Sequence, residues 1–311
     1  MQVCYLILAH NNIAHLLNII NALYSNNSTF VVHIDKKYNL SKSEISSLKE
    51  RKVKLVDNRV DVSWGDISVV DAVIETINHA LKNVRAESYC LISGADYPMK
   101  TKSYIHDYLS NNQNKNFVIA KEIPSKNISW LEGGRRRLEG YVINLNSRNN
   151  ATIIPREFFA LGNLKQLVKI CMINIYKLPE ALNHLFSSPK RVTPYYMKMY
   201  GGEMWWILTH SSLSKIMSFL DDHPNYYLFH KDTQIPDEIF FNTLIANLCE
   251  NQCNDIKRYI KWGSGNNSSP DWITMKDVEI IDACLKNENI LFARKIKDKD
   301  VVEYINTKLN R

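Results

Sequence analysis

The stretch QVCYLILAHNNIAHLLNIINALYSNNSTFVVHID, residues 2–35, decides the fold class. Its residues 2–10 form a continuous apolar run, which is typical of a strand buried on both faces of a sheet. Residues 13–24 then repeat leucine and isoleucine at helical spacing, and residues 30–35 form a second, β-branched strand. A strand, a helix and a strand in this order predict a parallel β-α-β unit.

The same alternation continues through the first half of the chain. Further strand-like segments lie at residues 53–57, 88–93 and 117–122, and helix-like segments lie at residues 41–52, 68–82 and 101–109. This order predicts an α/β fold with a mainly parallel central sheet flanked by helices. The 311 residues are 45% hydrophobic, which is enough for one large domain, and no low-complexity linker divides them.

The second half of the chain is less regular. Residues 127–200 contain three consecutive arginines, Arg135–Arg137, and a helical stretch at residues 158–186 that we expect Pro179 to interrupt. The arginines fit either a site for an anionic partner or, more commonly, a solvated basic loop. An aromatic strand is predicted at residues 201–209.

Polar residues follow the ends of several predicted strands. In open α/β sheets, ligands bind beyond the carboxyl ends of the parallel strands. We therefore expect one rim of the sheet to carry a binding site formed by His10, Asp35, Lys36, Trp64, Gly65, Ser93 and Asp96. His33 lies within an apolar strand and is interpreted as a core histidine. Trp206 is also expected in the core, whereas Trp205 could fill the core or offer a flat face for a sugar.

Two adjacent carboxylates lie in the segment Pro236–Asp237–Glu238. Proline and acidic residues both suit the first turn of a helix, so ordinary helix-start chemistry explains them on this segment alone. The functional alternative is a general base at Glu238. The positive end of the helix would keep this carboxylate ionised, as a base requires.

Two adjacent cations, Arg294 and Lys295, end a short strand-like run. Arginine binds phosphate oxygens in a fork and lysine supplies a point charge, so together they could neutralise a diphosphate. The alternative is a solvated pair in a lysine-rich tail. A metal ion would be another way to neutralise such a group. The Asp-x-Asp sequence Asp298–Asp300 lies in the charged tail and resembles a helix cap, so we expect no metal site.

The charge and the apolar runs limit the possible partners. The net charge is +7, but the basic residues are dispersed and no nucleic-acid-binding motif appears, so we expect no nucleic-acid partner. No run of 18 apolar residues and no basic leader occurs, which favours a cytoplasmic chain. The segment Leu164–Leu185 mixes lysines with apolar residues. It could lie peripherally on the inner face of a membrane, or it could be a buried helix.

The ordered segments of the chain resemble one known family. They are LAH (8–10), HIDKK (33–37), VSWG (62–65), SGADYPMKT (93–101), GGEMWW (201–206), PDEIFFNTL (236–244), RYIKW (258–262) and LFARK (291–295). Together they resemble the core-2/I-branching enzyme family, which includes β-1,6-N-acetylglucosaminyltransferases and peptide O-xylosyltransferases. The chain looks like a compact bacterial member.

The resemblance implies a GT-A-like nucleotide-binding fold and inverting transfer from a UDP-sugar, with neither a metal ion nor another cofactor. Glu238 is similar to the proposed base of the family, with Asp237 beside it, and Arg294 and Lys295 look like the diphosphate clamp. Asp35 and Asp96 match the nucleotide-binding segments. The roles of Glu203, Gly202 and Trp205 follow from the GGEMWW segment, which resembles the place where donor sugar and acceptor meet.

The resemblance also implies an organisation and a range of substrates. We expect a single domain, 1–311, with a nucleotide-binding half at about 1–125 and an acceptor-binding and catalytic half at about 126–311. The donor sugar is expected to be N-acetylglucosamine or xylose, and the acceptor a glycan or lipid-linked saccharide of a bacterial surface polysaccharide. A glycoside hydrolase and a non-catalytic sugar- or nucleotide-binding relative remain as alternatives.

Overall fold

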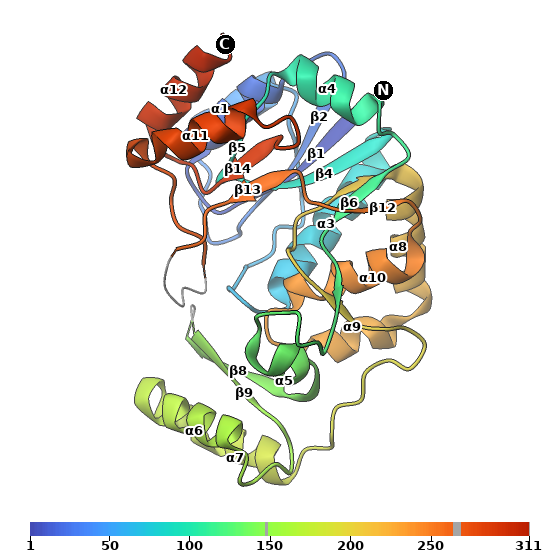
Figure 1. The fold of residues 1–311 in the computed structure, drawn as a ribbon, viewed down its shortest axis with the longest axis vertical. Coiled ribbons are helices and arrows are strands. Elements are labelled where there is room, and N and C mark those ends of the chain that lie inside the picture. Colours follow the sequence, from blue (N-terminus) through green and yellow to red (C-terminus); the bar gives the residue numbers. More distant parts are fainter. Residues whose placement is uncertain (147–148, 264–268, 311) are drawn as a thin grey trace.

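The structure is a computed structural model that describes residues 1–146, 149–263 and 269–310 (Figure 1). Within these ranges, a seven-stranded sheet has the order β12-β6-β11-β4-β1-β2-β3. Its strands are β1 (Val3–Ala9), β2 (Ser28–Ile34), β3 (Lys54–Leu55), β4 (Ser88–Ser93), β6 (Asn116–Val118), β11 (Ile207–Thr209) and β12 (Gln252–Asn254). β1 pairs in parallel with β2 and β4, whereas β11 runs antiparallel to β4 and β6. The predicted α/β class with a mainly parallel sheet is confirmed.

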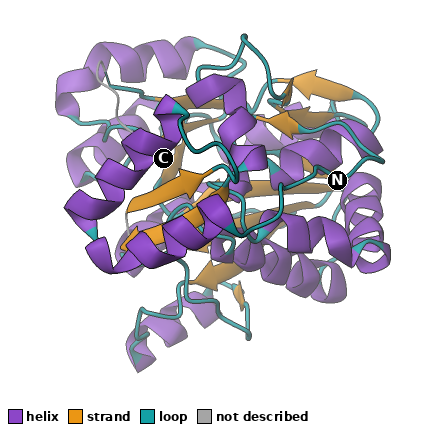
Figure 2. Ribbon diagram, turned by 90° about the horizontal axis from the view of Figure 1, so that it is seen from below, coloured by secondary structure: helices purple, strands orange, loops and turns teal. Residues whose placement is uncertain are grey.

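Helices cover both faces of this sheet, so that the strands lie between helical layers (Figure 2). One face carries α1 (Ile13–Leu23), α2 (Lys42–Glu50), α4 (Lys102–Ser110), α11 (Val278–Lys286) and α12 (Lys299–Lys308). The other carries α3 (Ser68–Asn83), α8 (His210–Asp222), α9 (Pro224–His230) and α10 (Phe240–Leu248). β1 serves both layers because alternate side chains of a strand point to opposite faces. Tyr5 and Ile7 join the first hydrophobic cluster, and Cys4 and Leu6 join the second.

Two smaller sheets attach later parts of the chain to this body. β14 (Phe292–Arg294) pairs in parallel with β13 (Arg258–Ile260) and antiparallel with β5 (Asp96–Pro98). β10 (Tyr200–Gly201) pairs with β7 (Lys121–Glu122). These pairings bring strands from near the C-terminus beside the loop that follows β4, and strands from both halves of the sequence share each sheet.

A small lobe projects from the body at the end opposite both termini (Figure 1). It consists of the described residues of 141–186. Its elements are the hairpin β8 (Tyr141–Asn146) and β9 (Asn149–Ile153), with α6 (Leu161–Ile173) and α7 (Leu178–Phe186) packed on it. Ile143, Ile153, Ile170 and Leu185 belong to a hydrophobic cluster that is separate from those of the main sheet. The lobe therefore has a core of its own.

The predicted helical stretch at residues 158–186 is interrupted, and the break lies just before Pro179. α6 ends at Ile173, and the turn Ile175–Lys177 separates it from α7. Pro179 lies in the first turn of α7, where its missing N–H costs no helical hydrogen bond.

In the parts of the chain that the structure describes, no helix is both long and apolar enough to span a bilayer.

Candidate active site

The carboxyl ends of β1 and β2 form part of the predicted polar rim. The Nδ1 atom of His10 lies 3.5 Å from Oδ2 of Asp35, and the His10 ring is largely exposed. The Asp35 carboxylate is nearly buried, and its Oδ1 accepts a hydrogen bond from the backbone N–H of Lys37 at 2.9 Å. The side chain of Lys36 is exposed. The rim thus presents an exposed imidazole, held beside a fixed carboxylate, and a lysine to solvent.

Gly65 connects this rim to the turn that contains Asp237 and Glu238. Its carbonyl oxygen accepts a hydrogen bond from the backbone N–H of Ile235 at 3.1 Å. Gly65 has a φ of +70°, and a Cβ atom there would lie 2.8 Å from the side-chain amide of Asn150, so both conformation and space favour glycine. The half-exposed ring of Trp64 lies next to it along the chain.

Gly202 brings the GGEMWW segment against the candidate catalytic turn. Its N–H donates a hydrogen bond to the carbonyl oxygen of Glu238 at 2.9 Å. A Cβ atom at Gly202 would lie 1.9 Å from the carbonyl oxygen of Ile119, so no other residue fits without moving the backbone. This close approach places Glu203, the next residue, in the same part of the structure as Glu238.

Asp237 and Glu238 lie in a 3-10 turn, η3 (Pro236–Glu238), which precedes α10. Ile239 separates the two elements with a φ of −124°, outside the helical range. The prediction that the carboxylates begin an α-helix is therefore wrong by one turn. The helix end does not hold them directly, and the source of their stabilisation must be a nearby side chain.

That side chain is Arg137, in α5 (Arg135–Glu139). Its Nη1 donates a hydrogen bond to Oε2 of Glu238 at 2.6 Å, and about a quarter of the Glu238 side chain remains exposed. The guanidinium also stacks on Trp130, 3.7 Å from the ring centre. Arg137 thus fixes the Glu238 carboxylate from one side and leaves part of it accessible.

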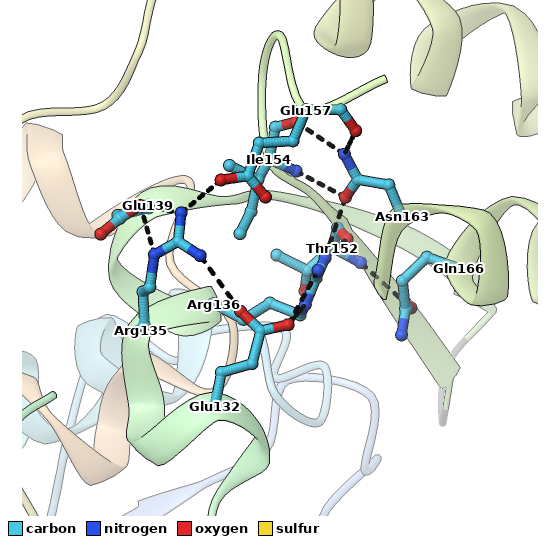
Figure 3. A network of polar contacts seen from close by, with 9 residues as sticks. All are labelled: Glu132, Arg135, Arg136, Glu139, Thr152, Ile154, Glu157, Asn163 and Gln166. Atoms are coloured by element: carbon cyan, nitrogen blue, oxygen red, sulfur yellow. Dashed lines mark hydrogen bonds and ion pairs between the residues drawn. The ribbon is translucent and has the colours of Figure 1, made fainter. Parts of the chain in front are cut away.

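The other two arginines of this helix also have protein partners, so the prediction of a solvated basic loop is wrong (Figure 3). Arg135 donates to the carboxylate of Glu139 at 2.9 Å. Arg136 is buried and donates to the carbonyl oxygen of Thr152 at 3.0 Å and to Oδ1 of Asn163 at 2.9 Å. The donors of Arg136 join α5 to β9 and α6, because a cation buried at a junction requires such partners.

Asp96 is completely buried and organises the opposite side of the site. Its Oδ2 accepts a hydrogen bond from the backbone N–H of Ser93 at 2.7 Å and lies 3.3 Å from Nη2 of Arg258. Its Oδ1 lies 3.7 Å from Nη1 of Arg294, which stands directly opposite Asp96 in the β5–β14 register. Arg258 was not among the predicted site residues, although it lies in the RYIKW segment.

Arg258 and Arg294 retain unused hydrogen-bonding capacity. The Arg258 side chain is buried and that of Arg294 is mostly buried, and the buried Nε and Nη1 atoms of both have no hydrogen-bond partner among the described residues. The Trp205 ring lies against both guanidinium groups, at 4.8 Å from that of Arg258 and 4.2 Å from that of Arg294. Buried, unsatisfied donors on cations are costly, and an anionic ligand would satisfy them. Trp205 is itself buried in the core, with its ring against both arginines.

The side chain of Lys295 has different contacts from that of its neighbour Arg294. Its Nζ donates a hydrogen bond to Oγ of Ser269 and lies 5.8 Å from the centre of the Trp272 ring. Burial lowers the pKa of Lys295, and the charge of Arg294 lowers it further. The predicted cationic pair therefore places Arg294 against Asp96, while Lys295 lies beside Trp272.

Two carboxylates near Glu238 are shifted toward their protonated forms. Burial raises the pKa of Glu203 to about 7, with a further rise from the charge of Glu238, while Arg294 and Arg258 oppose the shift. Burial and Glu238 likewise raise the pKa of Asp237 to about 7. The charges of these carboxylates and of the two arginines thus influence one another within one site. Carboxylates with shifted pKa values beside cations are typical of sites for acid–base chemistry.

The raised pKa of Glu203 predicts a stability effect for Glu203→Gln. The pKa is 4.5 in the unfolded chain and about 7 in the folded one, so the wild type loses stability as the pH rises between these values. The variant has no such loss, and we expect its relative free energy of unfolding to increase from pH 4.5 to 7 by about 3 kcal/mol at most. Denaturant unfolding across this range measures it. The exposed Glu303→Gln should show no such trend, and equal trends would contradict the shift.

Three further predictions, for His33, Trp206 and Asp298, are confirmed by the surroundings of these residues. His33 is a core histidine, as predicted, because its Nε2 accepts a hydrogen bond from the N–H of Val60 at 2.8 Å and burial lowers its pKa to about 4. Trp206 is fully buried, as predicted. Asp298 caps α12, as predicted for the Asp-x-Asp sequence. Among the described residues, no group of three or more His, Cys, Asp or Glu side chains has the arrangement of a metal site.

Comparisons with known proteins agree with the ordered motifs. The sequence model of the core-2/I-branching enzyme family matches residues 3–283. Xylosyltransferase 2 of Canis lupus familiaris and that of Homo sapiens are each 22% identical over 271 residues, which cover 84% of this chain and 27% of the relative. Xylosyltransferase of Ciona intestinalis is 20% identical over 99% of this chain and 34% of its own length. The chain thus spans about a quarter to a third of the curated relatives it matches.

Among solved structures, the crystal structure of S. aureus TarS matches 47% of this chain and 25% of its own chain, with 15% identity and a TM-score of 0.28. That score is too low to support an argument about the site. The family match extends over most of the sequence and includes the segments that contribute Asp96, Glu203, Glu238 and Arg258. The chain belongs to the core-2/I-branching enzyme family.

Proposed function

We propose that the chain is an inverting glycosyltransferase that moves a sugar from a UDP-sugar to a hydroxyl group, without a metal ion. The observation that carries the proposal is the pairing of two buried, incompletely satisfied arginines with a nearby cluster of carboxylates. Family membership supports a glycosyltransferase, and the xylosyltransferase relatives support a sugar donor. The GT-A-like fold of the family agrees with the parallel sheet and its polar rim.

In this proposal, Glu238 is the general base. Of Glu203, Asp237 and Glu238, it is Glu238 that has a cation, Arg137, at hydrogen-bond distance among the described contacts. Glu238 is therefore best suited to carry a negative charge. Because the pKa values of Glu203 and Asp237 are near 7, these two can remain protonated and reduce the repulsion. Glu238 takes the proton of the acceptor hydroxyl as the oxygen attacks the anomeric carbon.

The arginines act on the leaving group. Negative charge grows on the UDP diphosphate as its bond to the sugar breaks, and Arg294 and Arg258 supply donors already held in place by Asp96. Preorganised donors are effective because they need not reorient during the reaction. Lys295 contributes a further positive charge nearby. These cations perform the task that a metal ion has in other diphosphate chemistry.

The remaining site residues are assigned by position. The rim residues His10, Asp35 and Lys36 are proposed to contact the nucleotide, with Trp64 and Gly65 beside them. Glu203, with Gly202 and Trp205, is proposed to lie where the donor sugar meets the acceptor. The donor sugar is proposed to be xylose or N-acetylglucosamine, and the acceptor a glycan or lipid-linked saccharide. A cytoplasmic location in bacterial surface polysaccharide synthesis remains part of the proposal.

Removal of divalent metal ions should leave the reaction intact. Purified chain is incubated with UDP-xylose or UDP-N-acetylglucosamine and a panel of aryl glycoside acceptors, and released UDP is measured with EDTA or with manganese. We expect acceptor-dependent UDP release whose rate differs less than about twofold between the two conditions, because the cations of the clamp are side chains. A strict manganese requirement would contradict the proposal, and so would release of free sugar from a glycan without any nucleotide.

A further inference from the structure

The lobe and the loop that follows it carry most of the exposed large apolar side chains in the described parts of the chain. Residues 156–198, between β9 and β10, contain 13 of the 19 large hydrophobic side chains that are exposed in the described parts of the chain. Phe159 is 93% exposed and Met172 is 81% exposed. Large exposed apolar patches are uncommon on soluble proteins and mark surfaces that bind a partner or a membrane.

The two opposite sides of α6 have different surroundings. Asn163 and Ile170 are buried against the lobe, as the packed face of a helix should be. The outward side carries an exposed stripe that consists of Leu161, Leu164, Val168 and Met172, within about 80° of one another at 3.6 residues per turn. We call these four residues, together with the adjacent Phe159, the outer face. The residues of the inward side are buried against the rest of the lobe, whereas the outer face has no partner among the described residues.

The segment that carries the outer face is also strongly basic. Residues 156–198 contain seven Lys and Arg residues and two Asp and Glu residues, a net charge of +5 out of +7 for the whole chain. Both acidic residues are paired: Glu157 contacts Arg135, and Glu180 lies 2.7 Å from Lys177. The exposed Lys165 lies beside the stripe on α6. A second copy of the chain would bring like charges together, so an anionic partner is favoured.

The lobe is held firmly in the position that exposes this face. Arg136 reaches from α5 to Asn163 in α6 (Figure 3), and a Cβ atom at Gly162 would lie 2.0 Å from Nη2 of Arg136. The outer face is therefore part of a built structure, and it lies at the end of the molecule away from both termini (Figure 1).

We propose that the outer face docks on an anionic lipid bilayer. Its apolar stripe enters the boundary between head groups and acyl chains, and Lys165 contacts the head groups, as in helices that lie in the plane of a membrane surface. The same basic helix α5 that anchors the lobe carries Arg137, the partner of Glu238, so docking holds the candidate site close to the bilayer. The docking needs no nucleotide, so it stands or falls separately from the proposed chemistry.

Vesicle flotation of the full chain tests this inference. We expect the chain to float with vesicles of 70:30 phosphatidylcholine:phosphatidylglycerol, to bind phosphatidylcholine vesicles much more weakly, and to dissociate from both in high salt. The double variant Val168→Glu/Met172→Glu should lower the partition coefficient more than about tenfold, because it removes apolar burial and adds repulsion. Lys165→Glu should lower it by about fivefold or more, at about 1 kcal/mol per basic residue.

The matched control is Leu228→Glu, at an exposed leucine on α9 outside the lobe, and it should bind like the wild type. Circular dichroism and thermal unfolding establish that each variant is folded. Failure of the folded wild type to bind anionic vesicles would overturn the inference, as would equal binding by the double variant. Dimerisation that Val168→Glu/Met172→Glu abolishes, in the absence of lipid binding, would also overturn it and assign the face to a second copy.

Discussion

Glu238→Gln is expected to lower kcat by roughly 100- to 10,000-fold, which is the range attributed to a positioned general base. The amide keeps the size of the side chain and can still accept a hydrogen bond from Arg137, but it cannot take the proton of the acceptor hydroxyl. UDP binding should change less than twofold, because the diphosphate is assigned to the arginines around Asp96. Initial rates of UDP release and calorimetric titration with UDP measure the two quantities.

The exposed Glu303→Gln is the matched control and should retain full activity. Near-normal turnover by Glu238→Gln would contradict its role as the base. In that case Glu203, whose pKa is raised to about 7, would be the next candidate, and Glu203→Gln would have to show the loss instead. The two variants together therefore identify the carboxylate that accepts the proton.

Arg294→Gln is expected to weaken UDP binding and to lower kcat by roughly 100- to 1,000-fold, as the loss of one preorganised donor does in other active sites. Arg294 stands opposite Asp96 in the sheet, with unsatisfied nitrogen atoms beside Trp205. Glutamine removes the charge and the fork of donors, while Arg258 still compensates the buried Asp96. Calorimetry with UDP and initial-rate kinetics, both in EDTA, give the binding and catalytic effects separately.

Lys297→Gln provides the control for the loss of one positive charge. Lys297 lies three residues further along the chain, and its Nζ is 4.4 Å from the centre of the exposed Trp272 ring. We expect UDP binding by this variant to remain within twofold of the wild type. If the two variants lose equal affinity, the effect is one of overall charge, and the assignment of Arg294 to the diphosphate is wrong.

The fold was largely predictable because its first half is built from local β-α-β units. Continuous apolar runs predict β1 and β2, and helical spacing predicts α1. The right-handed, parallel connection between the two strands follows from the geometry of β-α-β units. The antiparallel direction of β11 was not predictable, since a strand of only three residues, Ile207–Thr209, carries no signal for its direction. The small sheet of β5, β13 and β14 joins segments that are far apart in the sequence.

Site residues were predictable where a short sequence motif indicates their role. They were less predictable where the role arises from contact with a residue far away in the sequence. Glu238 and Arg294 were identified from their segments, whereas Arg258 was not identified and Arg137 was considered only as part of an anion site or a basic loop. Arg258 acquires its role from pairing with Asp96, 162 positions earlier in the numbering, and Arg137 from contact with Glu238. The solvated-loop prediction for the three arginines failed because a single sequence does not show the acidic partners that other segments supply.

The proposed metal-independent UDP-sugar site lies between the arginines around Asp96 and the carboxylates around Glu238. Thermal-shift measurements of the purified chain in EDTA test for it, with a panel of UDP-, GDP-, CMP- and dTDP-sugars and the free nucleotides. We expect selective stabilisation by UDP and by one UDP-sugar, lost in Arg294→Gln and kept in Lys297→Gln. A flat response to every nucleotide, or stabilisation that appears only after manganese is added, would contradict it.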